Sequence, residues 1–289
     1  MKVTGFTFIR NAITYDYPIL EAITSILPLC DEVVVAVGAS TDDTLNFIKG
    51  IPSNKIRIIQ TVWNDNLREG GQVLAEETNK AFAAIAADSD WAFYIQGDEV
   101  VHERYHDEIL QQMKRWKDNK NVDGLLFKYL HFYGSYDYIG TSSKWYSNEI
   151  RIIKNNNKIY SYRDAQGFRK EDNQKLHVKP IDAYIYHYGW VKKPEAMQRK
   201  QEDFNKLWHS DEWVDKNVIK AAAFDYSSID RLQRFTETHP LVMQERIRYQ
   251  NWIFDYDLSH NSTTWKEWTK QQLKSRFGLD FFYKNYIIV

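Results

Sequence analysis

Two strand-like segments that end abruptly in polar and acidic residues constrain this chain most. Residues 32–37 are almost wholly apolar and run into Gly-Ala-Ser-Thr-Asp-Asp-Thr, and residues 91–95 run into Gln-Gly-Asp-Glu. Such apolar runs are typical of strands buried on both faces of a parallel sheet. Open sheets of this kind bind ligands at the carboxyl ends of their strands. The sequence therefore predicts an α/β fold with a ligand site at that edge.

Strand-like and helical patterns alternate through the first half of the chain. The expected strands are residues 3–9, 32–37, 55–62, 91–95 and 124–132, and the expected helices are residues 18–27, 41–48, 72–87 and 102–117. This alternation predicts a mostly parallel sheet with helices on both faces.

The pattern changes after about residue 135. Residues 149–154 and 158–162 flank three asparagines and predict a hairpin, and residues 183–188 predict a further strand. Residues 194–208 and 240–254 have helical patterns. We therefore expect a sheet domain over residues 1–192 and a helical C-terminal region over residues 193–289 that packs on it as an appendage.

Composition narrows the class of protein. The formal net charge of −1 argues against a nucleic-acid partner, which would call for a strong basic excess. No apolar stretch approaches the roughly 20 residues that cross a bilayer, and the first residues lack the apolar core of a signal peptide. The single cysteine, Cys30, fits a reducing compartment. We expect a cytoplasmic protein without a transmembrane segment, with peripheral membrane contact left open.

In their order and spacing, five segments resemble a bacterial family 2 glycosyltransferase with the GT-A fold. The segments are residues 8–11, 32–44, 71–79, 93–99 and 187–191. The resemblance covers roughly residues 3 to 200. It implies transfer of a sugar from a nucleotide-sugar donor, most commonly a UDP-sugar, to a carbohydrate or lipid-linked acceptor hydroxyl, usually with Mn²⁺ or Mg²⁺. It also implies a role in assembly of surface polysaccharide or lipopolysaccharide.

The chain departs from the family pattern at two places. Many members carry Asp-Asp-Gly before Ser-Thr, where one Asp contacts the nucleotide, but this chain has Val37, Gly38 and Ala39. The usual Asp-x-Asp motif is Gln96-Gly97-Asp98 here, so the second Asp is kept and the first is replaced. The departures bear on recognition of the base or ribose more than on a metal contact.

Three residues are candidate metal ligands. Asp98 and Glu99 are adjacent carboxylates at a strand end, and His187 lies in the downstream segment of the resemblance. Oxygen ligands with one imidazole suit Mn²⁺ or Mg²⁺, which would stabilise the leaving diphosphate. The alternative for the carboxylates is a solvated turn. The alternative for His187 is a buried, hydrogen-bonded histidine.

An inverting transfer also needs a base that takes the proton of the acceptor hydroxyl. Asp164 follows the predicted hairpin, roughly where the family places its acceptor-side acid, and Glu149 is the second candidate. The alternatives are loop or strand carboxylates that pair with the neighbouring Arg163 and Arg151.

Further residues near the predicted strand ends are candidates for donor binding: Arg10, Asn11, Ser40, Asp42, Arg68, Gly71, Asn79 and Gln96. Polar side chains at helix starts also cap helices, so capping is the competing interpretation of the residues that follow the second strand.

Two other functions compete with glycosyl transfer. A nucleotidyltransferase would favour a Gly-rich basic loop after the first strand, but residues 8–12 contain no glycine. A non-catalytic carbohydrate- or nucleotide-binding module is compatible with Gln96 and with the many aromatic residues, since fold alone does not define activity.

Overall fold

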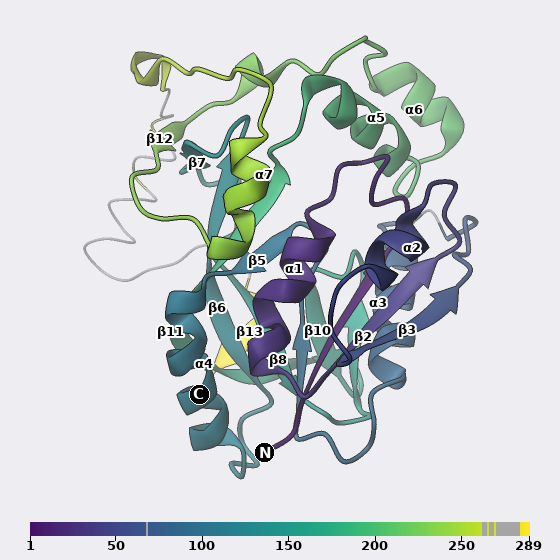
Figure 1. Ribbon diagram of the computed structural model, residues 1–289, viewed down its shortest axis with the longest axis vertical. Coiled ribbons are helices and arrows are strands. Elements are labelled where there is room, and N and C mark those ends of the chain that lie inside the picture. The colour runs from purple at the N-terminus through teal and green to yellow at the C-terminus, as the bar shows by residue number, and fades with distance from the viewer. Residues whose placement is uncertain (68, 262–264, 266–268, 270–283) are drawn as a thin grey trace.

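The computed structural model describes residues 1–67, 69–261, 265, 269 and 284–289 and has a mixed α/β architecture (Figure 1). The strands are β1 (Val3–Ile9), β2 (Glu32–Gly38), β3 (Ile56–Thr61), β4 (Trp91–Tyr94), β5 (Glu99–Val101), β6 (Gly124–Tyr133), β7 (Tyr138–Gly140), β8 (Asn148–Lys154), β9 (Ile159–Tyr162), β10 (Gly167–Lys170), β11 (Gln174–Trp190), β12 (Leu232–Arg234) and β13 (Tyr286–Ile288). The helices are α1 (Ile19–Ile26), α2 (Thr44–Lys49), α3 (Gln72–Ala83), α4 (His106–Trp116), α5 (Pro194–Asn205), α6 (Asp211–Asn217) and α7 (Gln244–Arg248).

The main sheet has the strand order β3-β2-β1-β4-β8-β6-β11-β10-β9. Strands β3, β2, β1 and β4 pair in parallel, and β8 runs antiparallel between β4 and β6. Strand β6 pairs with β11 in parallel. The carboxyl ends of β1, β4, β6 and β11 therefore point to the same edge of the sheet, which is the edge where the sequence predicts a ligand site.

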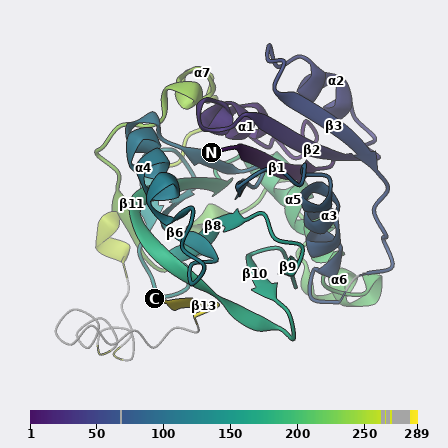
Figure 2. The same cartoon turned by 90° about the horizontal axis from the view of Figure 1, so that it is seen from below.

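Helices cover both faces of the sheet, as expected from the alternating pattern. One buried cluster joins α1 and α4 to the sheet through residues such as Ile23 and Ile109, and a second joins α3 to the other face through Phe82. Figure 2 shows α1 and α4 on one side and α3 on the opposite side. The sheet is therefore buried on both faces, which explains the largely apolar character of β1, β2 and β4.

The predicted hairpin of residues 149–154 and 158–162 is wrong. Both segments are strands, but β8 pairs with β4 and β6, whereas β9 pairs with β10. Strand β8 carries Ile150, Ile152 and Ile153, all fully buried, so it gains more from a place inside the sheet than from an exposed ribbon.

The predicted helix over residues 240–254 is also wrong in part, because the helical conformation ends at Arg248. Only a short 3₁₀ turn, Leu241–Met243, and α7 are helical. Beyond α7 the Trp252 indole N–H donates to the carbonyl of Gly134 over 2.8 Å, and Phe254 packs on the same glycine. These contacts with the end of β6 hold residues 252–254 out of a helix, so tertiary packing overrides the local helical pattern.

Segments beyond residue 192 pack on the sheet. Met243 is buried with Phe132 of β6 and Tyr186 of β11, and Met197 of α5 is buried with Tyr133. Whether residues 193–289 form a separate unit stays a prediction. Among the described residues, no helix combines the length and the apolar character needed to cross a membrane.

Candidate functional site

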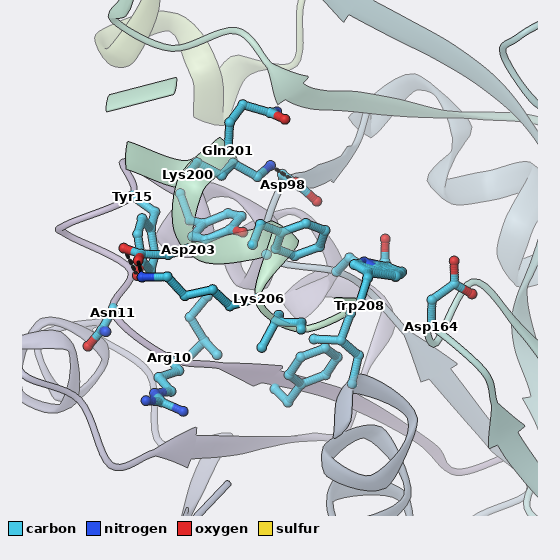
Figure 3. Close-up of a pocket in the computed structure, with 18 of the residues that line it drawn as sticks. Arg10, Asn11, Tyr15, Asp98, Asp164, Lys200, Gln201, Asp203, Lys206 and Trp208 are labelled. Atoms are coloured by element: carbon cyan, nitrogen blue, oxygen red, sulfur yellow. Dashed lines mark hydrogen bonds and ion pairs between the residues drawn. The ribbon is translucent and has the colours of Figure 1, made fainter. Parts of the chain in front are cut away.

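A cleft of about 560 Å³ lies at the carboxyl ends of β1 and β4. Its walls come from the loops after these strands, from β11 and from the last turns of α5 with the chain that follows (Figure 3). Six of the residues proposed from the sequence line it: Arg10, Asn11, Gln96, Asp98, Asp164 and His187. The parallel sheet thus brings together side chains that are far apart in the sequence.

Asp98 follows β4 and is the buried acid of this cleft, with 8% of the residue exposed. Its Oδ1 lies 3.8 Å from Nε2 of His187, and its Oδ2 lies 3.3 Å from Nζ of Lys200. Burial alone would raise the pKa of Asp98, but nearby positive charge, above all that of Lys200, outweighs burial and lowers the pKa to about 2. Asp98 is therefore a carboxylate at neutral pH.

A buried histidine pair determines which nitrogen of His187 faces Asp98. His131 Nε2 lies 2.7 Å from the carbonyl oxygen of Tyr146, which only accepts, so this nitrogen carries the proton. Burial lowers the pKa of His131 to about 3, so its Nδ1 carries none. That Nδ1 lies 3.0 Å from Nδ1 of His187, which must then donate. Burial also lowers the pKa of His187, so its ring is neutral and the remaining Nε2 presents a lone pair to the Asp98 carboxylate.

The space beside His187 Nε2 and the Asp98 carboxylate depends on Gly189. A Cβ at Gly189 would lie 2.7 Å from Nε2 of His187 and 2.8 Å from Oδ2 of Asp98, so any other residue would fill this corner. The Lys200 ammonium reaches it from α5 and donates to the Gly189 carbonyl oxygen over 3.1 Å. A lone pair facing a carboxylate calls for a cation, and the lysine supplies one.

The residues of this corner fit a hard divalent cation. Carboxylate oxygen and a neutral imidazole nitrogen are ligands of Mn²⁺ and Mg²⁺. Within the described parts of the chain, no cluster of three or more His, Cys, Asp or Glu side chains surrounds such an ion. Asp98 and His187 would therefore hold the cation only together with oxygens of a ligand or water.

Glu99 points away from this corner and binds Arg151. Its carboxylate accepts from Nε and a terminal nitrogen of Arg151 over 2.8 and 2.7 Å, and Tyr129 donates to it over 2.7 Å. Both ionic side chains are fully buried. Arg151 also donates to the carbonyl oxygen of Gln166, in the loop that carries Asp164. We therefore interpret Glu99 as an anchor beneath the cleft rather than as a metal ligand.

The Glu99→Gln variant is expected to lose about 3–5 kcal/mol of unfolding free energy, because Arg151 would stay buried without a counter-charge. Its melting temperature should fall by roughly 10 °C. Glu171→Gln is the matched control, since its ion pair with Lys158 is more than half exposed and should contribute under about 1 kcal/mol. A Glu99→Gln protein that melts like the parent but no longer binds Mn²⁺ would instead restore Glu99 as a ligand.

The polar residues after β2 hold the loop after β1. The Ser40 hydroxyl accepts from the backbone N–H of Asn11 over 3.1 Å, and Asp42 accepts from the backbone N–H groups of Thr14 and Thr44 over 2.8 and 3.1 Å. Ser40 and Asp42 do not line the cleft. Of this group Asn11 lies at the cleft wall, with the left-handed φ of 53° that asparagine tolerates well.

Two more donor-site candidates have structural partners. Asn79 exchanges two hydrogen bonds with the backbone of Ser161, over 2.7 and 2.9 Å, and so ties α3 to β9. Gly71 has a φ of +70°, and a Cβ there would lie 2.7 Å from the ring of Trp208, which lines the cleft. Gly71 therefore shapes the cleft indirectly, because its lack of a side chain leaves room for the Trp208 ring. Arg68 lies outside the described residues.

The two candidate bases differ in position. Asp164 lines the cleft, and its Oδ1 accepts from the backbone N–H of Gln166 over 3.4 Å. Burial raises its pKa, opposed by nearby backbone N–H groups and by Arg163 and Arg151. Glu149 does not line the cleft; it lies on β8 behind Gln166, whose side-chain amide donates to Oε1 over 2.9 Å. The two carboxyl groups are thus held by the same glutamine.

Sequence reasoning missed the contribution of α5 and of several aromatic residues. Lys200, Phe204 and Trp208 line the cleft at helical spacing, and Tyr17 lies within 5.0 Å of the Lys200 ammonium, measured to its ring centroid. The i, i+4, i+8 repeat of these three residues was the available signal, but a helical stripe is more often core than cleft. Trp63 also lines the cleft and packs on Gly38, where many family members carry an acid.

Comparison with known proteins adds similarities to solved structures alone. No family model and no curated protein matches this chain. The crystal structure of S. aureus TarS aligns over 70% of this chain at 18% identity with a TM-score of 0.43, and the alignment spans 38% of that protein. A TarS fragment in complex with UDP aligns over 77% of this chain and 68% of its own, at 16% identity and a TM-score of 0.43.

A third structure is glucosyl-3-phosphoglycerate synthase from Mycobacterium tuberculosis in complex with Mn²⁺, UDP and glucosyl-3-phosphoglycerate. It aligns over 46% of this chain and 45% of its own at 19% identity, with a TM-score of 0.32. All these TM-scores are below 0.5, so the proposed function rests on the site itself.

Proposed function

We propose that this protein is an inverting, cation-dependent glycosyltransferase of the family 2, GT-A type. The observation that carries the proposal is a pair of unprotonated atoms that can ligate a metal. Asp98 Oδ1 and His187 Nε2 lie 3.8 Å apart at the carboxyl edge of the sheet. A carboxylate and a neutral imidazole that face each other there are suited to a cation shared with an anionic ligand. A nucleotide-sugar is such a ligand, because its diphosphate carries the negative charge.

The donor side of the cleft has groups for a diphosphate and for a base. A bound Mn²⁺ or Mg²⁺ would neutralise charge on the leaving diphosphate. Lys200 is positioned to add a second positive charge, because its ammonium already contacts Asp98. The rings of Phe8 and Trp63, 5.7 Å apart between centroids, offer apolar surface to a nucleobase, with Arg10 stacked over Trp63. We propose a UDP-sugar as the donor.

Asp164 is the proposed base. In an inverting transfer the acceptor oxygen attacks the sugar carbon from the face opposite the leaving diphosphate while a carboxylate takes its proton. Asp164 lines the same cleft as Asp98 but comes from the loop between β9 and β10. Arg151 holds this loop by its hydrogen bond to the carbonyl oxygen of Gln166. Gln96 and Asn11 would border the donor at the ends of β4 and β1.

The wider cellular role follows from the resemblance in sequence. We propose a carbohydrate or lipid-linked acceptor, with a function in assembly of surface polysaccharide or lipopolysaccharide. A cytoplasmic location with peripheral membrane contact would fit such acceptors.

A donor panel tests the proposal. UDP, GDP, CDP and dTDP are titrated with Mn²⁺ while the melting temperature is followed, and the corresponding nucleotide-sugars are then assayed for sugar release and transfer. Ligand at 100 times its dissociation constant should stabilise the protein by about 2.7 kcal/mol, a shift of several degrees. The same titration with a chelator in place of Mn²⁺ is the control. A flat melting curve for all four nucleotides would count against the proposal.

The His131→Phe variant is expected to bind Mn²⁺ about 10- to 100-fold more weakly, because His187 loses the acceptor that orients its ring. Phenylalanine preserves the stacking of this side chain on Trp145, where the ring centroids are 5.0 Å apart. His131→Asn keeps an acceptor oxygen and should retain more affinity. Titration followed by Mn²⁺ electron paramagnetic resonance measures affinity, and ¹⁵N-histidine spectra of the apoprotein report which His187 nitrogen is protonated. Unchanged affinity in His131→Phe would refute the assignment.

A further inference from the structure

A second cavity of about 590 Å³ adjoins the cleft. Four residues line both spaces: Tyr146, Asp164, Gln166 and Trp208. Asp164 therefore lies between the donor side of the cleft and the second cavity. The base of a transfer reaction needs this position. It must contact the acceptor hydroxyl while the donor sugar lies within reach of the same hydroxyl.

The walls of the second cavity combine aromatic rings, neutral polar groups and, besides Glu149 and Asp164, the basic residues Lys144, Arg163 and Lys284. The rings belong to Trp145, Tyr146, Tyr162, Trp208 and Tyr286, and the polar groups to Ser143, Ser147, Asn148, Gln166 and Asn285. Aromatic faces pack on the C–H faces of a pyranose ring, while amides and hydroxyls both donate to and accept from its hydroxyl groups. The lining is thus suited to a polyhydroxylated ring.

Glu149 provides a polar group of this cavity that the protein itself leaves unused. The residue is 5% exposed, and Oε1 accepts from Gln166, but the buried Oε2 has no hydrogen-bond partner among the described residues. Burial raises the pKa of Glu149 to about 8; Arg151 opposes the rise, and Glu99 and Asp164 add to it. Near neutral pH the side chain is a carboxylic acid that can donate from Oε2. A buried donor without an acceptor is costly, so a ligand oxygen at this position would be favoured.

We propose that the second cavity binds the acceptor as a pyranose ring, with Glu149 Oε2 hydrogen-bonded to one ring substituent and the reacting hydroxyl at Asp164. This inference rests on the proposed glycosyl transfer and deepens it. The acceptor O–H proton passes to the Asp164 carboxylate as the new bond from acceptor oxygen to sugar carbon forms. The bond from that carbon to the diphosphate oxygen breaks, and its electron pair leaves with the diphosphate.

Three variants test the role of Glu149. Glu149→Leu removes the hydrogen-bonding group, Glu149→Gln keeps an amide that can donate from the same position, and Glu171→Gln is an exposed control. The probes are methyl glycosides of glucose, galactose, mannose and N-acetylglucosamine, detected by saturation-transfer NMR, with UDP and Mn²⁺ titrated separately by calorimetry. Melting curves confirm that each variant is folded.

We expect at least one glycoside to bind the parent and to bind Glu149→Leu about tenfold more weakly or worse, the effect of losing one buried hydrogen bond. Glu149→Gln should recover most of that loss, and UDP affinity should be the same in all proteins. Equal glycoside binding by Glu149→Leu, or binding by no protein while UDP binds, would overturn the acceptor assignment alone. Failure of UDP to bind the parent would instead overturn the proposed function.

Discussion

Asp98→Asn is expected to abolish cation-dependent donor binding and to lower sugar transfer by at least about 10²- to 10³-fold, the loss typical of removing one preorganised electrostatic contact. Asparagine preserves the size of the side chain but removes its negative charge. The Lys200 ammonium, 3.3 Å from Oδ2, would then remain in the corner without a counter-ion and repel an incoming cation. Calorimetric titration with Mn²⁺, and with UDP in the presence of Mn²⁺, measures the loss directly.

Asp182→Asn is the matched control for this variant. Asp182 also pairs with a lysine, Lys128 at 2.7 Å, but its side chain is 80% exposed and it does not line the cleft. The control should bind Mn²⁺ and UDP like the parent. If Asp98→Asn also binds both like the parent, the site of the cation lies elsewhere and the proposed function loses the observation that carries it.

Asp164→Asn is expected to lower turnover by about 10²- to 10⁴-fold with little change in the Michaelis constant for the donor, because an amide cannot take the acceptor proton. The structure offers a reason to expect a folded variant. Among the described residues Asp164 forms no salt bridge with Arg163, whose guanidinium lies over the ring of Tyr162 instead. An asparagine oxygen can still accept from the backbone N–H of Gln166. Melting and turnover are measured on the same preparation.

The pH dependence gives a second readout for Asp164. The carboxylate form is the base, and burial raises the pKa of this carboxyl above its ordinary value of 3.8. Turnover should therefore rise with pH through that raised pKa, and Asp164→Asn should lack this acidic limb. Should the variant instead lose activity only in proportion to a lower melting temperature, Asp164 would be an anchor of its loop and the base would have to be sought at Glu149.

Local patterns were sufficient to predict the strands that frame the site. Strands β1, β2 and β4 are short apolar runs bounded by polar residues, which is the sequence pattern typical of a buried strand. The placement of Asp98 at a strand end follows from this local pattern. His187 was singled out through its resemblance to a family segment, because nothing in its immediate sequence indicates what its ring faces.

Pairing between distant segments was beyond what local patterns encode. Strand β8 has the apolar character of an interior strand, but only the assembled sheet places it between β4 and β6 rather than beside β9. Lys200 is an ordinary polar position of α5 until the packing of that helix brings its ammonium to Asp98, 102 residues earlier in the chain. Contacts of this range depend on topology, and a single sequence carries no direct signal for them.

The adjacent acids Asp98 and Glu99 separate what the local sequence determines from what the tertiary structure determines. By itself the sequence determined that two carboxylates follow a buried strand, since the apolar run and its polar end are local properties. The tertiary structure alone decided that they part: Glu99 turns into the core to meet Arg151 of β8, and Asp98 faces the cleft with His187 and Lys200. The physical reason is that a buried charge needs a counter-charge, and the charged partners Arg151 and Lys200 come from segments more than 50 residues away.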